Sequence, residues 1–181
     1  MANILVVHGS PRKNGNSSLL ADAFIEGARE VGNTVARVDV GRLHINPCKA
    51  CEYCFKHEGA CVQKDDMQDL YPLMKGPDTI VYAFPLYTYS YPAQIKLFMD
   101  RMFCAVGCPG LFSFRRAALL VTFGDEDPHT ADGLVQSFHI LADYAHYEVL
   151  GEVLVDHVYD KGDIIGNPKL EEARAFGASI R

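Results

Sequence analysis

Short apolar runs alternate along the chain with longer segments in which apolar residues recur every three or four positions. The runs are rich in β-branched residues, which is typical of strands buried on both faces of a parallel sheet. They predict strands at residues 3–9, 34–40, 78–85, 116–124 and 148–157. The helically spaced segments predict helices at residues 19–32, 65–76, 92–103, 130–147 and 168–180.

Several residues mark the ends of these elements. Ser17 and Ser18 stand where the N-cap of the first helix is expected, and Gly32 stands where its C-cap is expected. Pro72 should kink or shorten the second helix, whereas Pro92 occupies a plausible first position of the third.

Five strands alternating with helices form βαβ units, which give a parallel sheet with helices on both faces. We therefore expect an α/β, flavodoxin-like three-layer sandwich with a five-stranded parallel sheet in the order 2-1-3-4-5. Residues 1–181 are expected to be one domain, with a cysteine-rich insertion around residues 44–64. In such sheets a ligand lies at the carboxyl ends of the strands, so function is sought just after Gly9, Phe84 and Phe123.

Composition narrows the class of partner. The 181 residues carry a net charge of −6 without an extended run of Lys or Arg, which disfavours nucleic acid. We expect no contact with a membrane, because apolar runs stay well below the roughly 18 residues of a span. The N-terminal "MANILVV" is interpreted as a first strand and not a signal peptide, so a cytoplasmic location is predicted.

The loop "HGSPRKNGNSS" after the first strand combines flexible glycines with hydroxyl and amide donors. Gly9 and Gly15 allow tight turns, and the following helix directs free N–H groups at the loop. Neither the P-loop pattern nor the dinucleotide fingerprint is present, so a phosphate monoester fits best, with Arg12 or Lys13 as countercharge. A plain β–α turn capped by serine is the alternative.

The loop "PLYTYSYPAQIK" after the third strand has three tyrosines in five residues between two prolines. The prolines fix the backbone, the tyrosines offer flat faces, and the N–H groups of the turn point outward, which together suit a planar heteroaromatic ring. Alternatively, the tyrosines could pack against a helix–sheet joint or a subunit interface. Thr122 and Gly124, at the end of the fourth strand, would form a third side of the same pocket.

Four of the six cysteines lie within fourteen residues in the spacing C-x2-C-x2-C-x6-C, at Cys48, Cys51, Cys54 and Cys61. Such spacing suits a 4Fe–4S cubane. Three alternatives stay open: a zinc site in which His57 replaces one thiolate, a redox dithiol, and free thiols. Cys104 and Cys108 are expected to be free cysteines in a hydrophobic loop.

The histidines are expected to be structural. His8, His129, His139 and His146 show no matching serine or cysteine nucleophile and no metal-pair spacing in the sequence. Asp39 stands where a dinucleotide fold would hold a ribose, but the glycine fingerprint is missing.

The segments "GSPRKNGNSSLL", "FPLYTYSYPAQIKLFMDR" and C-x2-C-x2-C followed by "DDM" together resemble the NADPH-dependent FMN reductase superfamily over roughly residues 3–125. The clustered cysteines resemble those of its iron–sulfur flavoproteins. The resemblance implies that the FMN phosphate lies on Ser10, Arg12, Asn16, Ser17 and Ser18. It implies that the ring lies against Pro85, Leu86, Tyr87, Thr88, Tyr89 and Ser90, with Thr122 and Gly124 on the third side.

The expected fold, pocket and cysteine spacing together predict a function. We expect an FMN-dependent oxidoreductase that passes electrons from NAD(P)H through the flavin to a quinone, flavin or similar acceptor, or to a protein. One alternative is an iron–sulfur flavoprotein electron carrier that links a 4Fe–4S cluster to FMN, and another is a flavin-free zinc or thiol module that binds a protein. The apolar segment at residues 102–114 predicts a homodimer or homotetramer.

Overall fold

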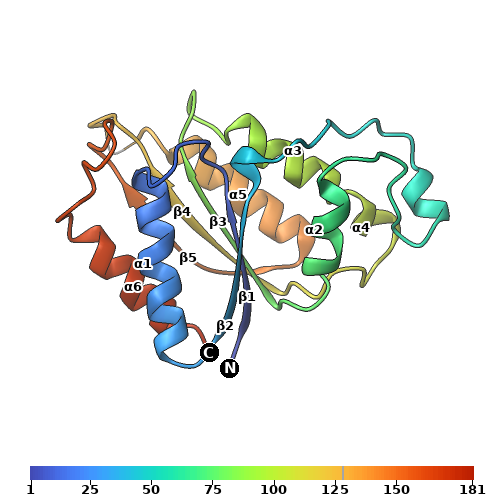
Figure 1. The fold of residues 1–181 in the computed structure, drawn as a ribbon, viewed down its shortest axis with the longest axis horizontal. Coiled ribbons are helices and arrows are strands. Elements are labelled where there is room, and N and C mark those ends of the chain that lie inside the picture. Colours follow the sequence, from blue (N-terminus) through green and yellow to red (C-terminus); the bar gives the residue numbers. More distant parts are fainter. Residues whose placement is uncertain (128) are drawn as a thin grey trace.

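The computed structural model describes residues 1–127 and 129–181. Its strands form one parallel sheet in the order β2-β1-β3-β4-β5 (Figure 1), which confirms the flavodoxin-like order predicted from the sequence. The strands are β1 (Asn3–His8), β2 (Thr34–Asp39), β3 (Thr79–Pro85), β4 (Arg116–Thr122) and β5 (Glu148–Val155). The helices are α1 (Asn16–Glu30), α2 (Met67–Leu73), α3 (Ala93–Arg101), α4 (Cys104–Gly107), α5 (Asp132–Ala145) and α6 (Lys169–Ser179), with short 3₁₀ turns η1 (Val40–Arg42) and η2 (Tyr53–Lys56).

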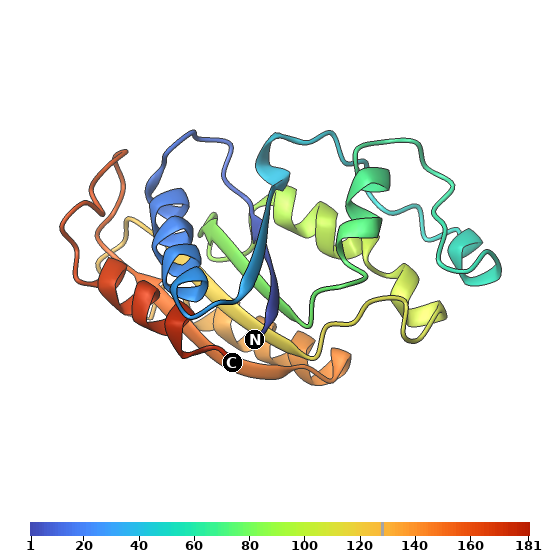
Figure 2. The same ribbon diagram turned by 60° about the horizontal axis from the view of Figure 1, so that its bottom comes forward.

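The sheet is covered on both faces, and each face has its own hydrophobic core (Figures 1 and 2). Helices α1 and α6 pack on one face, where Phe24 of α1 lies 5.5 Å from Phe176 of α6 between ring centroids. Helices α2, α3 and α5 supply the buried side chains of the other face. The central strands are therefore shielded from water, which explains their almost uninterrupted apolar sequences.

Two glycines allow α1 and α6 to approach each other closely. A Cβ atom on Gly27 would collide with the backbone carbonyl of Arg174, and one on Gly177 would collide with the carbonyl oxygen of Phe24. Because backbone atoms cannot move aside as a side chain can, glycine is required at both positions. The packing of α6 thus fixes the place of α1, whose N-terminus reaches the strand ends.

The predicted start of the first helix was wrong by a few residues. Helix α1 begins at Asn16 after Gly15 as N-cap, and Ser17 and Ser18 lie buried inside its first turn. Their hydroxyls contact side chains of β1 and β2, so they are not available as caps. Gly32, with φ of +89°, follows the C-cap residue by one position.

The cysteine-rich segment at residues 44–64 extends beyond α2 and α4, away from the sheet (Figure 1). It contains η2 and packs on the apolar segment that follows α3, where the rings of Phe55 and Phe103 lie 5.4 Å apart and Cys108 Sγ donates to Cys54 O at 3.6 Å. Part of the apolar segment is thus covered by the chain itself. Among the described helices, none is long and apolar enough to cross a membrane.

Candidate functional site

A pocket with a volume of about 300 Å³ opens at the carboxyl ends of β1, β3 and β4. This is the point where the strand order reverses, as the sequence predicted. The structure brings together most of the residues proposed to bind FMN, namely Ser10, Arg12, Asn16, Ser17, Pro85, Leu86, Tyr87, Thr88, Tyr89, Thr122 and Gly124. Two of the predicted residues, Ser18 and Ser90, are not among the described residues that line it.

One side of the pocket carries groups that can bind an anion. The buried hydroxyls of Ser10 and Ser17 line it, and Arg12 adds a positive charge. The N-terminus of α1 points here, its first turn carries no acidic residue, and within the described chain no side chain caps it. Free N–H groups and the positive end of the helix dipole therefore face the pocket.

Asn16 and Ser18 are occupied by other contacts. Asn16 Nδ2 donates to Asp160 O at 2.8 Å, and its Oδ1 accepts from the N–H of Gly162 at 2.9 Å, so Asn16 ties the loop after β5 to α1. Ser18 Oγ accepts from Arg37 Nη2 at 2.9 Å, behind the pocket wall. Asn16 lines the pocket as well, whereas Ser18 supports its wall from behind.

The opposite side is a tight turn from Tyr87 to Ser90. The two residues exchange backbone hydrogen bonds of 3.2 and 3.0 Å, and Thr88 and Tyr89 have φ of +49° and +59°. Two consecutive left-handed residues are the signature of a type I′ turn, which is strained for residues other than glycine, asparagine and aspartate. The turn is fixed at its base by the bond from Leu86 N–H to Thr122 O, at 2.9 Å.

The sequence reasoning missed the loop after β5. Val158 and Tyr159 line the pocket, as do Phe123, Asp125 and Thr130. A Cβ atom on Gly124 would come within 2.9 Å of the Tyr159 ring, so glycine is needed where the two loops meet. No local motif marks residues 158–164, because their place depends on contacts with Asn16 that span more than 140 positions.

The expectation that His8 lacks a serine partner was wrong. His8 is fully buried, with Nδ1 2.7 Å from Asp39 Oδ1 and Nε2 3.2 Å from Ser17 Oγ. Burial and then the positive charge of Arg37 lower the pKa of His8, and the hydrogen bond with Asp39 opposes this without outweighing it. Burial raises the pKa of Asp39, but the hydrogen bonds of Arg37 and His8 outweigh burial and bring it below its ordinary value.

The four clustered cysteines do not converge in the structure. Cys48 and Cys51 are exposed, Cys54 and Cys61 are half-buried, and all four are free thiols. Within residues 1–127 and 129–181, no group of three or more His, Cys, Asp or Glu side chains is arranged to hold a metal ion. The donor chemistry fits an iron–sulfur cluster, whereas this arrangement of the side chains does not.

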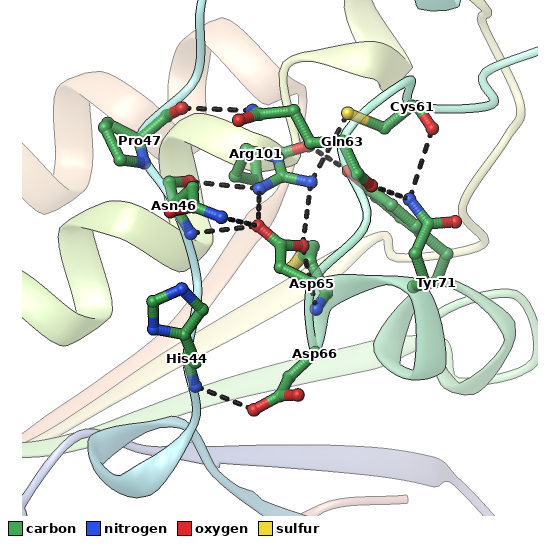
Figure 3. A network of polar contacts seen from close by, with 11 residues as sticks. His44, Asn46, Pro47, Cys61, Gln63, Asp65, Asp66, Tyr71 and Arg101 are labelled. Carbon is green, nitrogen blue, oxygen red and sulfur yellow. Dashed lines mark hydrogen bonds and ion pairs between the residues drawn. The ribbon is translucent and has the colours of Figure 1, made fainter.

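The two ends of the cysteine-rich segment meet at a buried ion pair that the sequence did not reveal (Figure 3). Arg101 Nη1 lies 2.6 Å from Asp65 Oδ2, and both side chains are almost wholly buried. Arg101 also donates to Asn46 O at 3.0 Å and to Cys61 Sγ at 3.3 Å. Burial raises the pKa of Asp65, but its hydrogen bonds with Arg101 and Asn46 outweigh this, so that its pKa lies below the ordinary value.

The fold is flavodoxin-like, and its pocket lies at the carboxyl ends of the strands. The model of the NADPH-dependent FMN reductase family matches residues 2–160. The chain therefore belongs to this family. Membership supports flavin-dependent oxidoreduction and the use of a nicotinamide dinucleotide.

Curated relatives carry the name iron–sulfur flavoprotein. One from Archaeoglobus fulgidus is 31% identical over 175 residues, which are 95% of this chain and 76% of that protein. One from Methanosarcina thermophila is 39% identical over 95 residues, which are 52% of this chain and 49% of that protein. Among solved structures, the NAD(P)H:quinone oxidoreductase from Methanothermobacter marburgensis has a TM-score of 0.77 at 18% identity, with 99% of each chain covered, which shows the shared fold.

Proposed function

We propose that this protein is an FMN-dependent oxidoreductase that takes reducing equivalents from NAD(P)H and passes them to a quinone, a flavin or a similar acceptor. The observation that supports this most is the pocket itself. Its anion-binding side and its tyrosine turn lie on opposite walls at the strand ends. A ligand with a phosphate at one end and a flat ring at the other fits both walls at once.

Each wall has a separate role in the proposal. Ser10, Ser17 and the α1 N-terminus bind the phosphate, and Arg12 neutralises part of its charge. Bound FMN would supply the hydride and electron chemistry, so no protein acid or base is required. The turn at residues 87–90 orients the ring through backbone groups, and Tyr89 in this turn is exposed to solvent.

The test combines cofactor binding with turnover. The purified protein is titrated with FMN and with riboflavin, and NADH and NADPH oxidation is measured with quinone, flavin, nitro and azo acceptors. We expect FMN to bind at least tenfold more tightly than riboflavin, because riboflavin lacks the phosphate. Absence of FMN binding, or equal affinity for both ligands, would contradict the proposal.

A second candidate function is electron transfer between a 4Fe–4S cluster and FMN. It is supported by the names of the curated relatives and by the spacing of Cys48, Cys51, Cys54 and Cys61. Binding of a cluster would require these side chains to move together from their present places.

Iron and sulfide analysis of anaerobically reconstituted protein tests this candidate. Replacing any one of the four cysteines by Ala should remove iron, whereas Cys108→Ala should not, although Cys108 lies against Cys54. FMN should stay bound in every variant. Flavin absorbance without iron would leave the reductase function alone, and a colourless protein would favour the flavin-free module.

We also propose that the protein is a homo-oligomer. Phe103 and Val106 remain 42% and 44% exposed after the chain has covered part of the segment at residues 102–114. Light scattering across the usable concentration range tests this, and a monomer throughout would contradict it.

A further inference from the structure

Asp39, His8 and Ser17 form a hydrogen-bonded chain that ends at the phosphate wall of the pocket. His8 Nδ1 lies 2.7 Å from Asp39 Oδ1, and His8 Nε2 lies 3.2 Å from Ser17 Oγ. His8 comes from the end of β1, Asp39 from the end of β2 and Ser17 from the first turn of α1. Of the three, Ser17 lines the pocket. The proposed binding of FMN does not explain why a histidine should be buried behind this serine.

The contacts determine which nitrogen of neutral His8 carries the proton. A carboxylate cannot donate, so the 2.7 Å contact requires that Nδ1 donates its N–H to Asp39. Arg37 Nη2 also approaches Nδ1, at 3.2 Å, but it has better acceptors in Asp39 and Ser18, at 2.8 and 2.9 Å. Nε2 of neutral His8 is therefore an acceptor, and the hydroxyl proton of Ser17 is donated to it.

In this arrangement Ser17 presents a hydrogen-bond acceptor to the pocket, where a phosphate needs a donor. With its proton given to His8, Ser17 presents only oxygen lone pairs to the pocket, and the oxygens of a phosphate dianion are acceptors as well. Protonation of His8 at Nε2 reverses the bond, because Nε2–H then donates to Ser17 Oγ. The Ser17 hydroxyl is then free to donate to the phosphate.

We propose that His8 is a positioning residue that takes up one proton from solvent when the FMN phosphate binds, and so converts Ser17 into a phosphate donor. This inference rests on the proposed function, since it concerns the same pocket. The balance is simple: the protein, an FMN phosphate dianion and one proton give a complex in which the proton resides on His8 Nε2. No covalent bond is made or broken.

The charges around His8 favour this uptake. From β2, Asp39 and Arg37 face it, and from α1 the nearest charge is Asp22, which pairs with Arg37. On β3 the strand partner of His8 is the uncharged Ala83. Two further arginines lie near this region. Arg42 of η1 is exposed to solvent, and Arg12 donates to Tyr159 O in the loop after β5, on the other side of the pocket wall from His8.

Two carboxylates and one guanidinium leave a net charge of −1 beside His8 before any ligand arrives. The phosphate adds further negative charge on the other side of Ser17, which stabilises an imidazolium. Burial lowers the pKa of His8 in the free protein, so the proton is absent until the phosphate binds.

Calorimetry of FMN binding at about pH 8, in buffers of different ionisation enthalpy, counts the protons taken up. At this pH the phosphate is already a dianion, because its second pKa is about 6. We expect about one proton for wild type with FMN and none with riboflavin. Between pH 7 and 9 the dissociation constant of FMN should rise by up to about tenfold for each pH unit.

His8→Gln keeps a side-chain N–H that can donate to Ser17 but cannot titrate. It should bind FMN without proton uptake and with a flat pH profile. If this buried substitution prevents folding, Asp39→Asn, at a partly exposed residue, should reduce the uptake and weaken FMN binding above pH 7. The matched control is His139→Gln, because His139 pairs with Glu152 at 2.7 Å on α5 and β5, and should leave the proton count unchanged.

The ¹⁵N spectrum of His8 in the FMN complex identifies the group that holds the proton. Imidazolium nitrogens support the inference, and neutral nitrogens overturn it by placing the proton on the phosphate. If FMN binds more tightly than riboflavin but no proton is taken up, the inference is also overturned. The proposed function would then remain intact. If FMN and riboflavin bind equally, the phosphate site itself is wrong.

Discussion

The pocket and the cysteine-rich segment are held in place in different ways. The pocket walls continue directly from strands β1, β3 and β4. These strands are buried on both faces and are paired with one another in parallel register. Residues 44–64 contain only η2 and are fastened at their two ends by Arg101 and Asp65. Figure 3 shows these ends converging on the one guanidinium.

This difference explains why the pocket is formed in the protein alone, whereas the four clustered cysteines do not converge. The sheet fixes the positions of side chains at the strand ends, so the two walls of the pocket face each other in the protein alone. The four cysteines lie on an irregular segment that has no such support, and they stay apart as free thiols. Bringing four thiolates together would require a metal ion to offset their mutual repulsion. The segment is therefore held at its base by a buried ion pair, while its four cysteines do not converge.

The largest effect is expected from removing the base of the cysteine-rich segment. Arg101→Met leaves the Asp65 carboxylate buried without its partner, and loss of one member of a buried ion pair typically costs about 3–5 kcal/mol. Urea unfolding monitored by circular dichroism measures the loss. Hydrogen exchange should increase first at residues 44–66, while the strands of the pocket stay protected.

The double variant Arg101→Met with Asp65→Leu is the matched control. It removes both charges, so it should recover part of the lost stability. A loss below about 1 kcal/mol in the single variant would mean that the ion pair does not support the segment.

The pocket depends on packing beneath α1, and an added methyl group tests this. Gly27→Ala places Cβ against the carbonyl of Arg174 and should cost about 1–3 kcal/mol by forcing α1 and α6 apart. FMN affinity should fall with it, because the N-terminus of α1 moves. Gly133→Ala, in α5, has open space around its Cβ and should stabilise the protein by up to about 1 kcal/mol through helix propensity. Thermal unfolding compares the two.

The sequence predicted the fold and its strand order because both follow from short-range patterns. Alternation of apolar strands with amphipathic helices leaves few topologies for the sheet. The loops after β1, β3 and β4 could be assigned to one pocket for the same reason, since parallel strands place their carboxyl ends side by side.

The remaining features depend on pairs that are distant in the sequence. Arg101 meets Asp65 across 36 positions, and Asn16 meets Asp160 across 144, and neither pair leaves a motif. Ser17 lies nine positions after His8 in the sequence, and only the geometry of the β1–α1 connection makes their side chains neighbours. Long-range side-chain contacts of this kind have no periodicity from which to predict them.

A smaller effect is expected at the ring wall of the pocket. Tyr89 has φ of +59°, which proline cannot adopt, so Tyr89→Pro should break the turn and weaken FMN binding by about tenfold or more. Tyr87→Phe should leave binding unchanged, because the turn is closed by backbone bonds. Fluorescence quenching of FMN measures both. Normal affinity in the Pro variant would show that this turn is not the ring site.

The smallest effect is expected from one hydroxyl of the phosphate wall. Ser17→Ala removes a single hydrogen bond and should weaken FMN binding by about 0.5–1.5 kcal/mol, which is roughly two- to thirteenfold. Ser17→Asp should weaken it further, since a carboxylate would then face the phosphate, and riboflavin affinity should change little in either variant. Both substitutions lie in the first turn of α1, far from the cysteine-rich segment, so iron content should stay the same. Equal FMN affinity in wild type and the Asp variant would contradict the placement of the phosphate at Ser17, and loss of iron would contradict the independence of the two regions.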